Sequence, residues 1–354
     1  MISDLRILFV ADLNAYSKGM GRVRALQDLD VPITALSHTA TGGAESGFAS
    51  ITMVDRILWK LGVQRDKAGI NRRLLDAAKE VGPHIIWIEK GNMIRPSALR
   101  ALRRIAPDAL LVSYAEDDMF LAHNRTRAYV KGLSCYDCVF TTKAPNVGPS
   151  ELPALGARRV IAVDKSYDPH VHFPVGVSEA DVERYGADVG FVGTFEAARA
   201  RSLSYLAENG IAVRVWGNGW EAWAARPPGL IIEDRAVVNT EHDLAYTKSL
   251  CATKINLGFL RKLNRDTQTD RTMEIPACGA FMLAERSDDH LRLFEEGHEA
   301  AFFGSDDELL EKVRYYLGHE DERAAIARAG RQKCLDAGYS ETERMRGMID
   351  QCRA

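Results

Sequence analysis

The feature that most constrains the fold is an alternation of short apolar segments with longer amphipathic ones along most of the 354 residues. The apolar segments are rich in β-branched and aromatic side chains, as strands buried on both faces are. In the first half we expect strands at Leu5–Ala11, Ile33–Leu36, His84–Glu89, Ala109–Tyr114 and Cys138–Thr141, and helices at Gly21–Leu29, Ile70–Val81, Ser97–Ile105 and Ala122–Ser134. This alternation predicts a parallel sheet with helices on both faces.

The alternation of apolar and amphipathic segments is interrupted by a less regular stretch, 163–186, and then resumes. The second half predicts strands at Val189–Val192, Ala212–Trp216, Leu230–Ile232, Ile255–Leu257, Phe281–Leu283 and Ala300–Phe303. Its expected helices are Ala198–Glu208, Glu241–Ser249, Thr272–Cys278, Asp289–Glu295, Asp306–Leu317, Glu320–Ala337 and Glu341–Cys352. We therefore expect an α/β protein with two tandem Rossmann-like domains, 1–165 and 186–338, whose strand ends face a central cleft.

Composition narrows the classes of partner. The chain is 46% hydrophobic and 27% charged, which is typical of a globular protein. Its 46 basic and 49 acidic residues nearly cancel, so no nucleic-acid partner is expected. The first apolar run is too short for a signal peptide, and no stretch reaches the roughly 18 apolar residues of a membrane span. These features predict a cytoplasmic protein without a transmembrane segment.

The six cysteines include a single C-x-x-C pair, Cys135 and Cys138. A structural zinc site needs a second pair at suitable spacing, which the sequence lacks. We expect buried thiols and no metal.

The most informative segment is the polar loop that leads into an apolar helix at 264–279. Arg271 and Glu274 are three residues apart near the helix start, so both side chains point the same way. An arginine beside a helix start can bind two phosphate oxygens, and a carboxylate one turn later can accept both hydroxyls of a ribose. The spacing alone fits equally well an i,i+3 ion pair on a surface helix.

Four segments of the second half carry a resemblance to a known family. They read R-T-M-E-I-P-A-C-G at 271–279, E-G-H-E-A at 296–300, D-V-G-F-V-G-T-F-E at 188–196 and W-G-N-G-W at 216–220. With these motifs the chain resembles the CgeB-like glycosyltransferases, a branch of the GT-B enzymes, over about its last half. One departure is Met273, where the family usually has Phe, and this swap keeps an apolar anchor.

The resemblance implies transfer of a sugar from a nucleotide diphosphate, most often uridine diphosphate (UDP). The acceptor is unspecified: a cell-envelope glycan, a protein or a small molecule. Glu274 would hold the ribose, and Arg271 and Arg265 would face the diphosphate. The final helix, 339–354, would pack back on the first domain. No metal or cofactor is implied beyond the nucleotide sugar, because basic side chains and a helix end neutralise the leaving diphosphate in such enzymes.

Further donor-site candidates accompany these three residues. Gly193 and Gly217 end two strands of one sheet, where a missing side chain lets backbone approach a ligand, although each also fits an ordinary tight turn. Arg199 and Gly279 belong to the family motifs, and Asp266 is a candidate for sugar contact. The acidic pairs at 288–289 and 306–307 each follow a serine, so we interpret them as helix starts.

The first half must supply the acceptor site and, for an inverting reaction, a general base. Candidate bases follow the first and fourth expected strands: Asp12, Asp117, Asp118 and His123, with Asp117 the first choice. Together with Glu116, the two later acids fit equally well a cap for the helix expected from Ala122. The tandem architecture disfavours a metal-binding D-x-D at Glu116-x-Asp118.

Two other functions remain open. A nucleotide-sugar epimerase uses the same two-domain architecture and needs no acceptor. A non-catalytic nucleotide-sugar-binding protein would keep the donor residues and lack turnover. Gly19-x-Gly21 is only part of a dinucleotide-binding motif, because a third glycine in register is missing.

Overall fold

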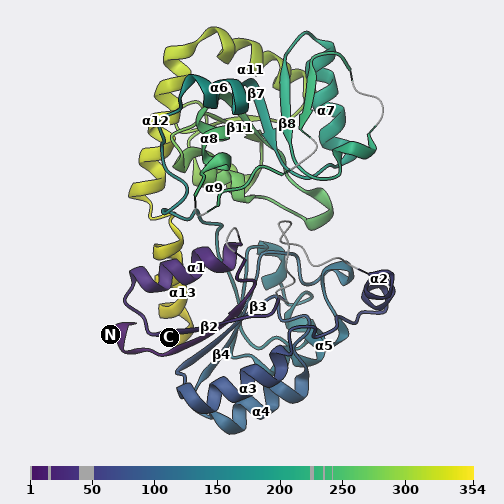
Figure 1. Ribbon diagram of the computed structural model, residues 1–354, viewed down its shortest axis with the longest axis vertical. Helices are drawn as coiled ribbons and strands as arrows, with labels where there is room; N and C mark the ends of the chain where they lie inside the picture. The colour runs from purple at the N-terminus through teal and green to yellow at the C-terminus, as the bar shows by residue number, and fades with distance from the viewer. Residues whose placement is uncertain (1, 15–16, 40–51, 224–226, 234–235, 241) are drawn as a thin grey trace. The chain divides into compact units, whose positions relative to one another are not determined.

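A computed structural model of the chain divides into two compact α/β units (Figure 1). It describes residues 2–14, 17–39, 52–223, 227–233, 236–240 and 242–354. The first unit comprises Met1–Asp164, Leu263–Arg265 and Glu341–Ala354. The second comprises Lys165–Lys262 and Asp266–Ser340. The chain thus returns to the first unit for its last helix.

The first unit is built on a six-stranded parallel sheet with the order β2-β1-β3-β4-β5-β6. Its strands are β1 (Ile7–Ala11), β2 (Ile33–Ser37), β3 (Ile85–Glu89), β4 (Leu110–Ala115), β5 (Cys138–Thr141) and β6 (Val160–Ala162). Its α-helices are α1 (Lys18–Asp28), α2 (Met53–Lys60), α3 (Ile70–Val81), α4 (Pro96–Ile105), α5 (Arg127–Gly132) and α13 (Glu341–Arg353).

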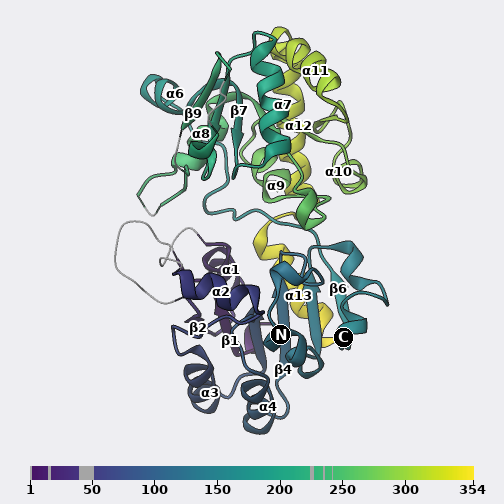
Figure 2. The same cartoon turned by 90° about the vertical axis from the view of Figure 1, so that its right-hand side faces the viewer.

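Alternate side chains of this sheet build two separate cores. Leu8 and Val10 of β1 pack with apolar residues of α3 and α4. Ile7 and Phe9, which point to the opposite face, pack with α1 and α13. Figure 2 shows α3 and α4 beside each other, with α1 and α13 elsewhere on the same unit. Both faces of β1 are fully buried, which explains its uninterrupted apolar sequence.

The second unit also contains a six-stranded parallel sheet, ordered β12-β11-β10-β7-β8-β9. Its strands are β7 (Ala187–Val192), β8 (Val213–Trp216), β9 (Leu230–Glu233), β10 (Thr253–Gly258), β11 (Met282–Glu285) and β12 (Ala301–Phe303). Its α-helices are α6 (Glu179–Tyr185), α7 (Ala197–Glu208), α8 (Ala245–Cys251), α9 (Asp270–Ala277), α10 (Asp288–Leu293), α11 (Asp306–Gly318) and α12 (Glu320–Asp336).

Each sheet has one point where the strand order reverses. In the first sheet this point lies between β1 and β3, and in the second it lies between β7 and β10. Ligands of open parallel sheets bind at such points, beyond the carboxyl ends of the strands. The residues that follow these four strands are therefore the first place to look for a site.

The two parallel sheets confirm the predicted α/β, Rossmann-like fold class. Several details differ from expectation. The helix predicted over Ala122–Ser134 is broken into a 3-10 turn, Ala122–Asn124, the helix α5 and a second 3-10 turn. The short elements α2, α6 and β6 were not expected, and the predicted start of a helix at residue 241 lies outside the described residues. Among the described helices, none is long and apolar enough to cross a membrane.

Candidate functional site

Three arginines gather where the strand order of the second sheet reverses. Arg199 lies in the first turn of α7, Arg261 follows β10, and Arg271 lies in the first turn of α9. The Nε atom of Arg271 donates a hydrogen bond of 3.1 Å to the carbonyl oxygen of Val192, the last residue of β7. Burial lowers the pKa of Arg199, and the positive charges of Arg271 and Arg261 lower it further, although Glu196 opposes them. Arg199 thus lies within electrostatic reach of both other arginines.

The side chain of Arg199 is largely buried, and part of its hydrogen-bonding capacity is unused. Its Nη1 atom donates to the carbonyl oxygen of Thr194 at 3.0 Å, and its guanidinium lies 5.6 Å from the ring centre of Phe191. Its Nε atom is buried and has no hydrogen-bond partner. A buried N–H group without a hydrogen-bond partner costs about 1–3 kcal/mol.

One carboxylate lies close to two of the three arginines. Glu196 is 3.0 Å from Nε of Arg261 and 3.7 Å from Nη1 of Arg199. The carboxylate of Asp270 lies 3.9 Å from Arg271, and also 3.0 Å from Nζ of Lys165. The side chain of Arg271 is 31% exposed, so its guanidinium is accessible to a ligand. The charges of Asp266 near Arg199 and of Glu274 near Arg271 balance the cations further. The exposed guanidinium of Arg271 is therefore the part of this edge best suited to a phosphate group.

Glu274, one turn after Arg271, is buried and its carboxylate is held by two aromatic residues. Its Oε2 atom accepts a hydrogen bond of 2.6 Å from the hydroxyl of Tyr246 on α8. Its Oε1 atom lies 3.8 Å from Nε2 of His172. Burial, with the charge of Glu274 added, raises the pKa of Tyr246 well above its usual value, so the phenol stays protonated and donates. Because Glu274 is only 4% exposed, the alternative of an exposed surface ion pair does not describe it.

The protonation of His172 follows from its other hydrogen bond. Its Nδ1 atom accepts from the backbone N–H of Asp168 at 3.2 Å, so the ring proton of the neutral imidazole lies on Nε2, the atom that faces Glu274.

Another histidine, His290, contacts the start of α9. Its Nε2 atom lies 2.8 Å from the hydroxyl of Thr272, and burial lowers its pKa. The sequence offered no signal for these roles, because they depend on long-range packing.

The three candidate glycines have backbone roles in the second unit. The N–H of Gly193 donates to the carbonyl of Trp216 at 2.8 Å. A Cβ on Gly217 would lie 2.0 Å from the carbonyl oxygen of Gly193, so the loops after β7 and β8 touch each other at these glycines. Gly279 has φ +66° and ends α9. The close approach therefore joins two protein loops, and it keeps both at the carboxyl edge of the sheet.

The two remaining donor candidates lie in the loop before α9. Arg265 belongs to the first unit, where it forms two hydrogen bonds of 2.8 and 2.7 Å with the carboxylate of Glu151 and a further ion pair with Asp118. Its charge is thus already compensated by carboxylates, and these partners raise its pKa above the usual value. Asp266 begins the return to the second unit, and its N–H donates to the carbonyl of Arg261 at 3.2 Å.

The four candidate bases of the first unit have different surroundings. Asp118 is fully buried, and its carboxylate accepts from Arg265 and from the N–H of Phe120. The cap predicted from this acid to a helix at Ala122 is wrong, because Leu121 occupies that cap position and no side chain caps the turn. His123 is exposed.

The other two candidates lie near the point where the first sheet reverses its strand order. Asp117 is partly exposed, and its Oδ2 atom lies 2.5 Å from Nζ of Lys90, which follows β3. Asp12 follows β1, and its Oδ1 atom accepts from the backbone and side chain of Asn14 at 3.2 and 2.8 Å. Both carboxylates therefore reach solvent at the carboxyl edge of their sheet.

A buried ionic cluster at the same edge was not anticipated. Arg22 of α1, only 2% exposed, pairs with Glu89 at the end of β3, with Glu116 at 3.0 Å and with Glu341 at 3.2 Å. Its guanidinium also lies 4.4 Å from the ring centre of Tyr114. Burial raises the pKa of Glu89, although the charge of Arg22 opposes the rise. Three carboxylates thus share one guanidinium.

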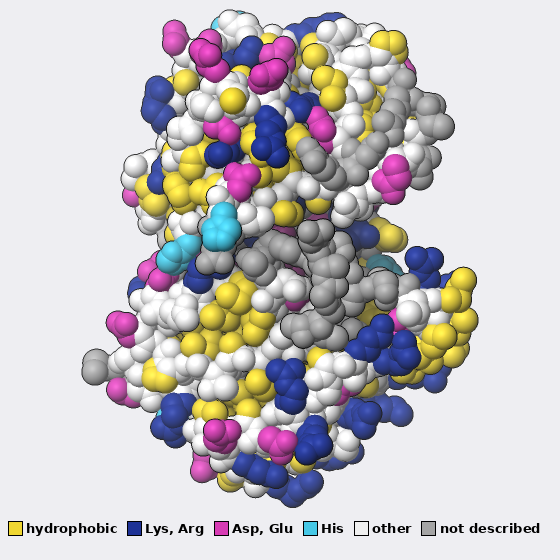
Figure 3. Space-filling model, in the orientation of Figure 1, with side chains coloured by type: hydrophobic (Ala, Val, Ile, Leu, Met, Phe, Trp, Pro, Cys, Tyr) yellow, Lys and Arg dark blue, Asp and Glu magenta, His cyan; other side chains and the backbone are white. Residues whose placement is uncertain are grey.

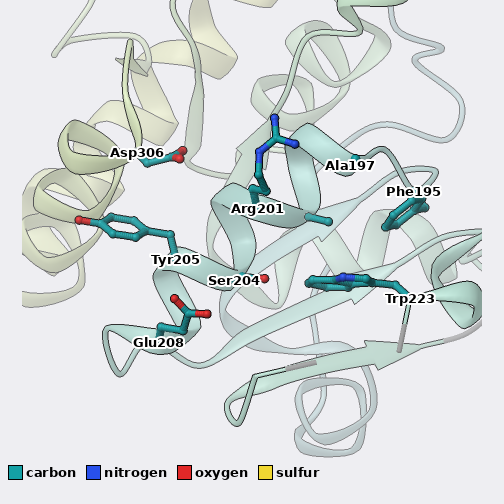
Figure 4. Close-up of a pocket in the computed structure, with 9 residues that line it drawn as sticks. Phe195, Ala197, Arg201, Ser204, Tyr205, Glu208, Trp223 and Asp306 are labelled. Carbon is teal, nitrogen blue, oxygen red and sulfur yellow. The ribbon is translucent and has the colours of Figure 1, made fainter. Parts of the chain in front are cut away.

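A cavity of about 620 Å³ opens elsewhere on the second unit. Figure 4 shows Phe195 and Trp223 near one end of it and Tyr205 with Asp306 at the other. Its lining includes Arg201 and the carboxylates Glu208 and Asp306, and none of the three clustered arginines. With one cation against two carboxylates this cavity is poorly suited to a diphosphate.

Solved structures with similar architecture cover nearly the whole chain. HepE from Anabaena, in complex with UDP-glucose, is 11% identical, with 98% of this chain and 99% of that chain covered and a TM-score of 0.59. A glycosyltransferase from Rickettsia africae is 9% identical over 99% and 98%, with a TM-score of 0.62. Sucrose-phosphate synthase from Thermosynechococcus elongatus is 10% identical over 99% and 98%, with a TM-score of 0.65. The fold is that of GT-B glycosyltransferases.

The sequence comparison agrees with the fold. Residues 197–350 match the family described as "Glycosyl transferase-like". No curated protein matches the chain. The carboxy-terminal part of the chain is therefore similar to this glycosyltransferase-like family, in agreement with the resemblance carried by its motifs.

Proposed function

We propose that the protein transfers a sugar from a UDP-sugar to an acceptor hydroxyl, with the donor bound by the second unit and the acceptor by the first. The observation that carries this proposal is the cluster of Arg199, Arg261 and Arg271 beside the buried Glu274, at the strand-order reversal of the second sheet. Support comes from HepE, a protein of the same fold whose structure contains UDP-glucose.

In this proposal, different residues of the second unit bind different parts of the nucleotide. Arg271 and Arg199 bind the diphosphate, because their guanidinium groups are cationic, adjacent and only partly paired. Glu274 binds the ribose, since a carboxylate can accept several hydrogen bonds and Tyr246 fixes its orientation. Negative charge grows on the diphosphate as the glycosidic bond breaks, so the arginines stabilise the transition state more than the ground state.

The first unit supplies the base that activates the acceptor. Asp117 remains our first choice and Asp12 the second, because both reach solvent beside the strand-order reversal of the first sheet. Asp118 is a weaker candidate, since its oxygens are engaged by Arg265 and Phe120. Asp117→Asn, Asp12→Asn, Asp118→Asn and His123→Gln should keep UDP affinity when folded, while one of them loses turnover. Near-normal turnover in all four folded variants would refute this assignment.

Thermal unfolding in the presence of nucleotides tests the donor proposal. UDP at 100 times its dissociation constant should stabilise the fold by about 2.7 kcal/mol, and UDP-glucose is the first sugar donor to test. Incubation with a UDP-sugar alone then separates the enzyme classes. A transferase leaves the donor intact or hydrolyses it slowly, whereas conversion into a second UDP-sugar would indicate an epimerase. The absence of any nucleotide-induced shift would contradict the proposed function.

A further inference from the structure

The helix α2 and the turn after it expose an unusual concentration of apolar side chains. Among the described residues, six of the fourteen exposed large apolar side chains lie between positions 53 and 63. We call these six the α2 patch: Met53, Val54, Ile57, Trp59, Leu61 and Val63. Their exposed fractions run from 36% to 70%. Single exposed apolar residues are common, but a contiguous group of this kind marks an interaction surface.

The fold holds this patch in place. Thr52 and Asp55 form a capping box that fixes the start of α2. At its other end, Nε1 of Trp59 donates to the carbonyl of His123 at 3.2 Å, and the carbonyl of Gly62 accepts from the N–H of Arg127 at 2.8 Å. The apolar side chains are therefore presented on an anchored helix.

Basic side chains surround the patch. Arg56 and Lys60 are exposed on α2 itself, and Arg127 and Lys131 are exposed one turn apart on the neighbouring helix α5. The one carboxylate of α2, Asp55, is taken by Arg65 and Lys67, each at 2.6 Å. Figure 3 shows dark blue side chains beside the yellow ones over α2. The surface thus combines apolar contact with uncompensated positive charge.

We propose that the α2 patch docks on a membrane surface that contains anionic lipid. An amphipathic helix with basic flanks lies in the plane of the interface, with its apolar face in the acyl boundary and its cations at lipid phosphates. A protein partner fits less well, because it would need acidic side chains to match the four cations, and two of these are lysines, which are depleted at protein interfaces. This docking is a surface property of the first unit and is independent of the donor site.

Sedimentation of the full chain with vesicles tests the proposal. Vesicles of phosphatidylcholine with 30% phosphatidylglycerol should bind the protein, and vesicles of pure phosphatidylcholine should bind it much more weakly. Replacement of Arg56 and Lys60 by Gln should weaken binding to the anionic vesicles about fivefold per residue. Ile57→Ser with Leu61→Ser should weaken it about tenfold or more, because apolar surface no longer leaves water.

A matched pair of substitutions controls for a general loss of surface apolarity. Leu291 and Leu335 have similar exposure, 46% and 49%, but lie on α10 and α12, so Leu291→Ser with Leu335→Ser should leave vesicle binding unchanged. All variants should keep the UDP-induced thermal shift. Absence of vesicle binding by the unsubstituted chain, or equal binding to both vesicle types, would overturn the proposal. So would a dimer in solution that Ile57→Ser and Leu61→Ser dissolve while vesicle binding persists.

Discussion

The carboxyl edges of the two sheets group their charged side chains differently in the same architecture. At the edge of the second sheet, Arg199 lies within electrostatic reach of Arg261 and Arg271, and its buried Nε–H has no partner. At the edge of the first sheet, a single guanidinium, that of Arg22, is surrounded by three carboxylates. Both sheets place loops beyond parallel strands. The residues in those loops, and not the fold, decide what each edge can bind.

The two clusters also differ in how far their arginine side chains are exposed to solvent. The side chain of Arg22 is 3% exposed and every partner of its guanidinium is in the protein. The side chain of Arg271 is 31% exposed and keeps surface for a ligand. Breaking a closed, buried cluster destabilises the fold, whereas an exposed guanidinium can contribute to the affinity for an anion.

Loss of the guanidinium in the first cluster should have the largest effect. Arg22→Met would leave Glu89, Glu116 and Glu341 close together without a cation, and breaking a buried ion pair in this way costs about 3–5 kcal/mol. The free energy of unfolding in urea measures this cost. UDP affinity should be unchanged in the variant when it is folded. A cost under about 1 kcal/mol would contradict the closed cluster.

Substitution of Glu274, the residue proposed to bind the ribose, should have the next largest effect. Glu274→Gln keeps the shape of the side chain and removes its charge, so affinity for UDP should fall by about 1.5–3 kcal/mol. The same substitution should cost 2′-deoxy-UDP less, because that ligand lacks one of the two hydroxyls. Tyr246→Phe is the matched control: it removes the hydrogen bond to the carboxylate and leaves its charge. Calorimetry that shows equal losses for the two nucleotides would remove Glu274 from the ribose site.

The smallest effect concerns the pH dependence of the first cluster. Burial raises the pKa of Glu89 above its ordinary value of 4.5. Below pH 4.5 the group is protonated in both folded and unfolded chains. Between pH 4.5 and the pKa of the folded state, Glu89 ionises in the unfolded chain but stays protonated in the folded one. The unfolded state gains stability over this range, so the stability that Glu89 contributes is lost as the pH rises through the folded pKa. Glu89→Gln should therefore cost less stability at pH 7 than at pH 4.5. A cost that grows with pH would contradict the burial argument.

The regular elements could be predicted because they are long enough to show a period. Strands such as β1 and β3 are buried on both faces and therefore uninterrupted in apolarity. The strand β6, Val160–Ala162, has only three residues at a sheet edge, which is too short to show a pattern. The helix α6 lies in the stretch that we expected to be irregular, where its capping box, Ser178 with Asp181, was the available signal.

The site was predictable only where a local motif carries it. Arg271 and Glu274 share one helix, so their spacing in sequence was informative. Tyr246 on α8 contacts Glu274, and Arg261 after β10 lies near Arg199. No local sequence pattern predicts these long-range contacts. Arg265 is a different case. The family resemblance implied a role for it at the diphosphate, whereas its guanidinium is engaged by Asp118 and Glu151 of the first unit.

These two arginines provide the most direct test of the account. Titration of UDP by calorimetry into Arg271→Ala and Arg265→Ala compares two cations of the same loop. We predict that Arg271→Ala weakens UDP binding by about 1.5–3 kcal/mol, the range for hydrogen bonds to charged groups. Arg265→Ala should leave UDP affinity within about 0.5 kcal/mol and instead lower the stability of the fold, because it leaves Asp118 buried without its cation. Unchanged affinity in Arg271→Ala, or a larger loss in Arg265→Ala, would contradict the assignment of the donor site to the arginine cluster of the second unit.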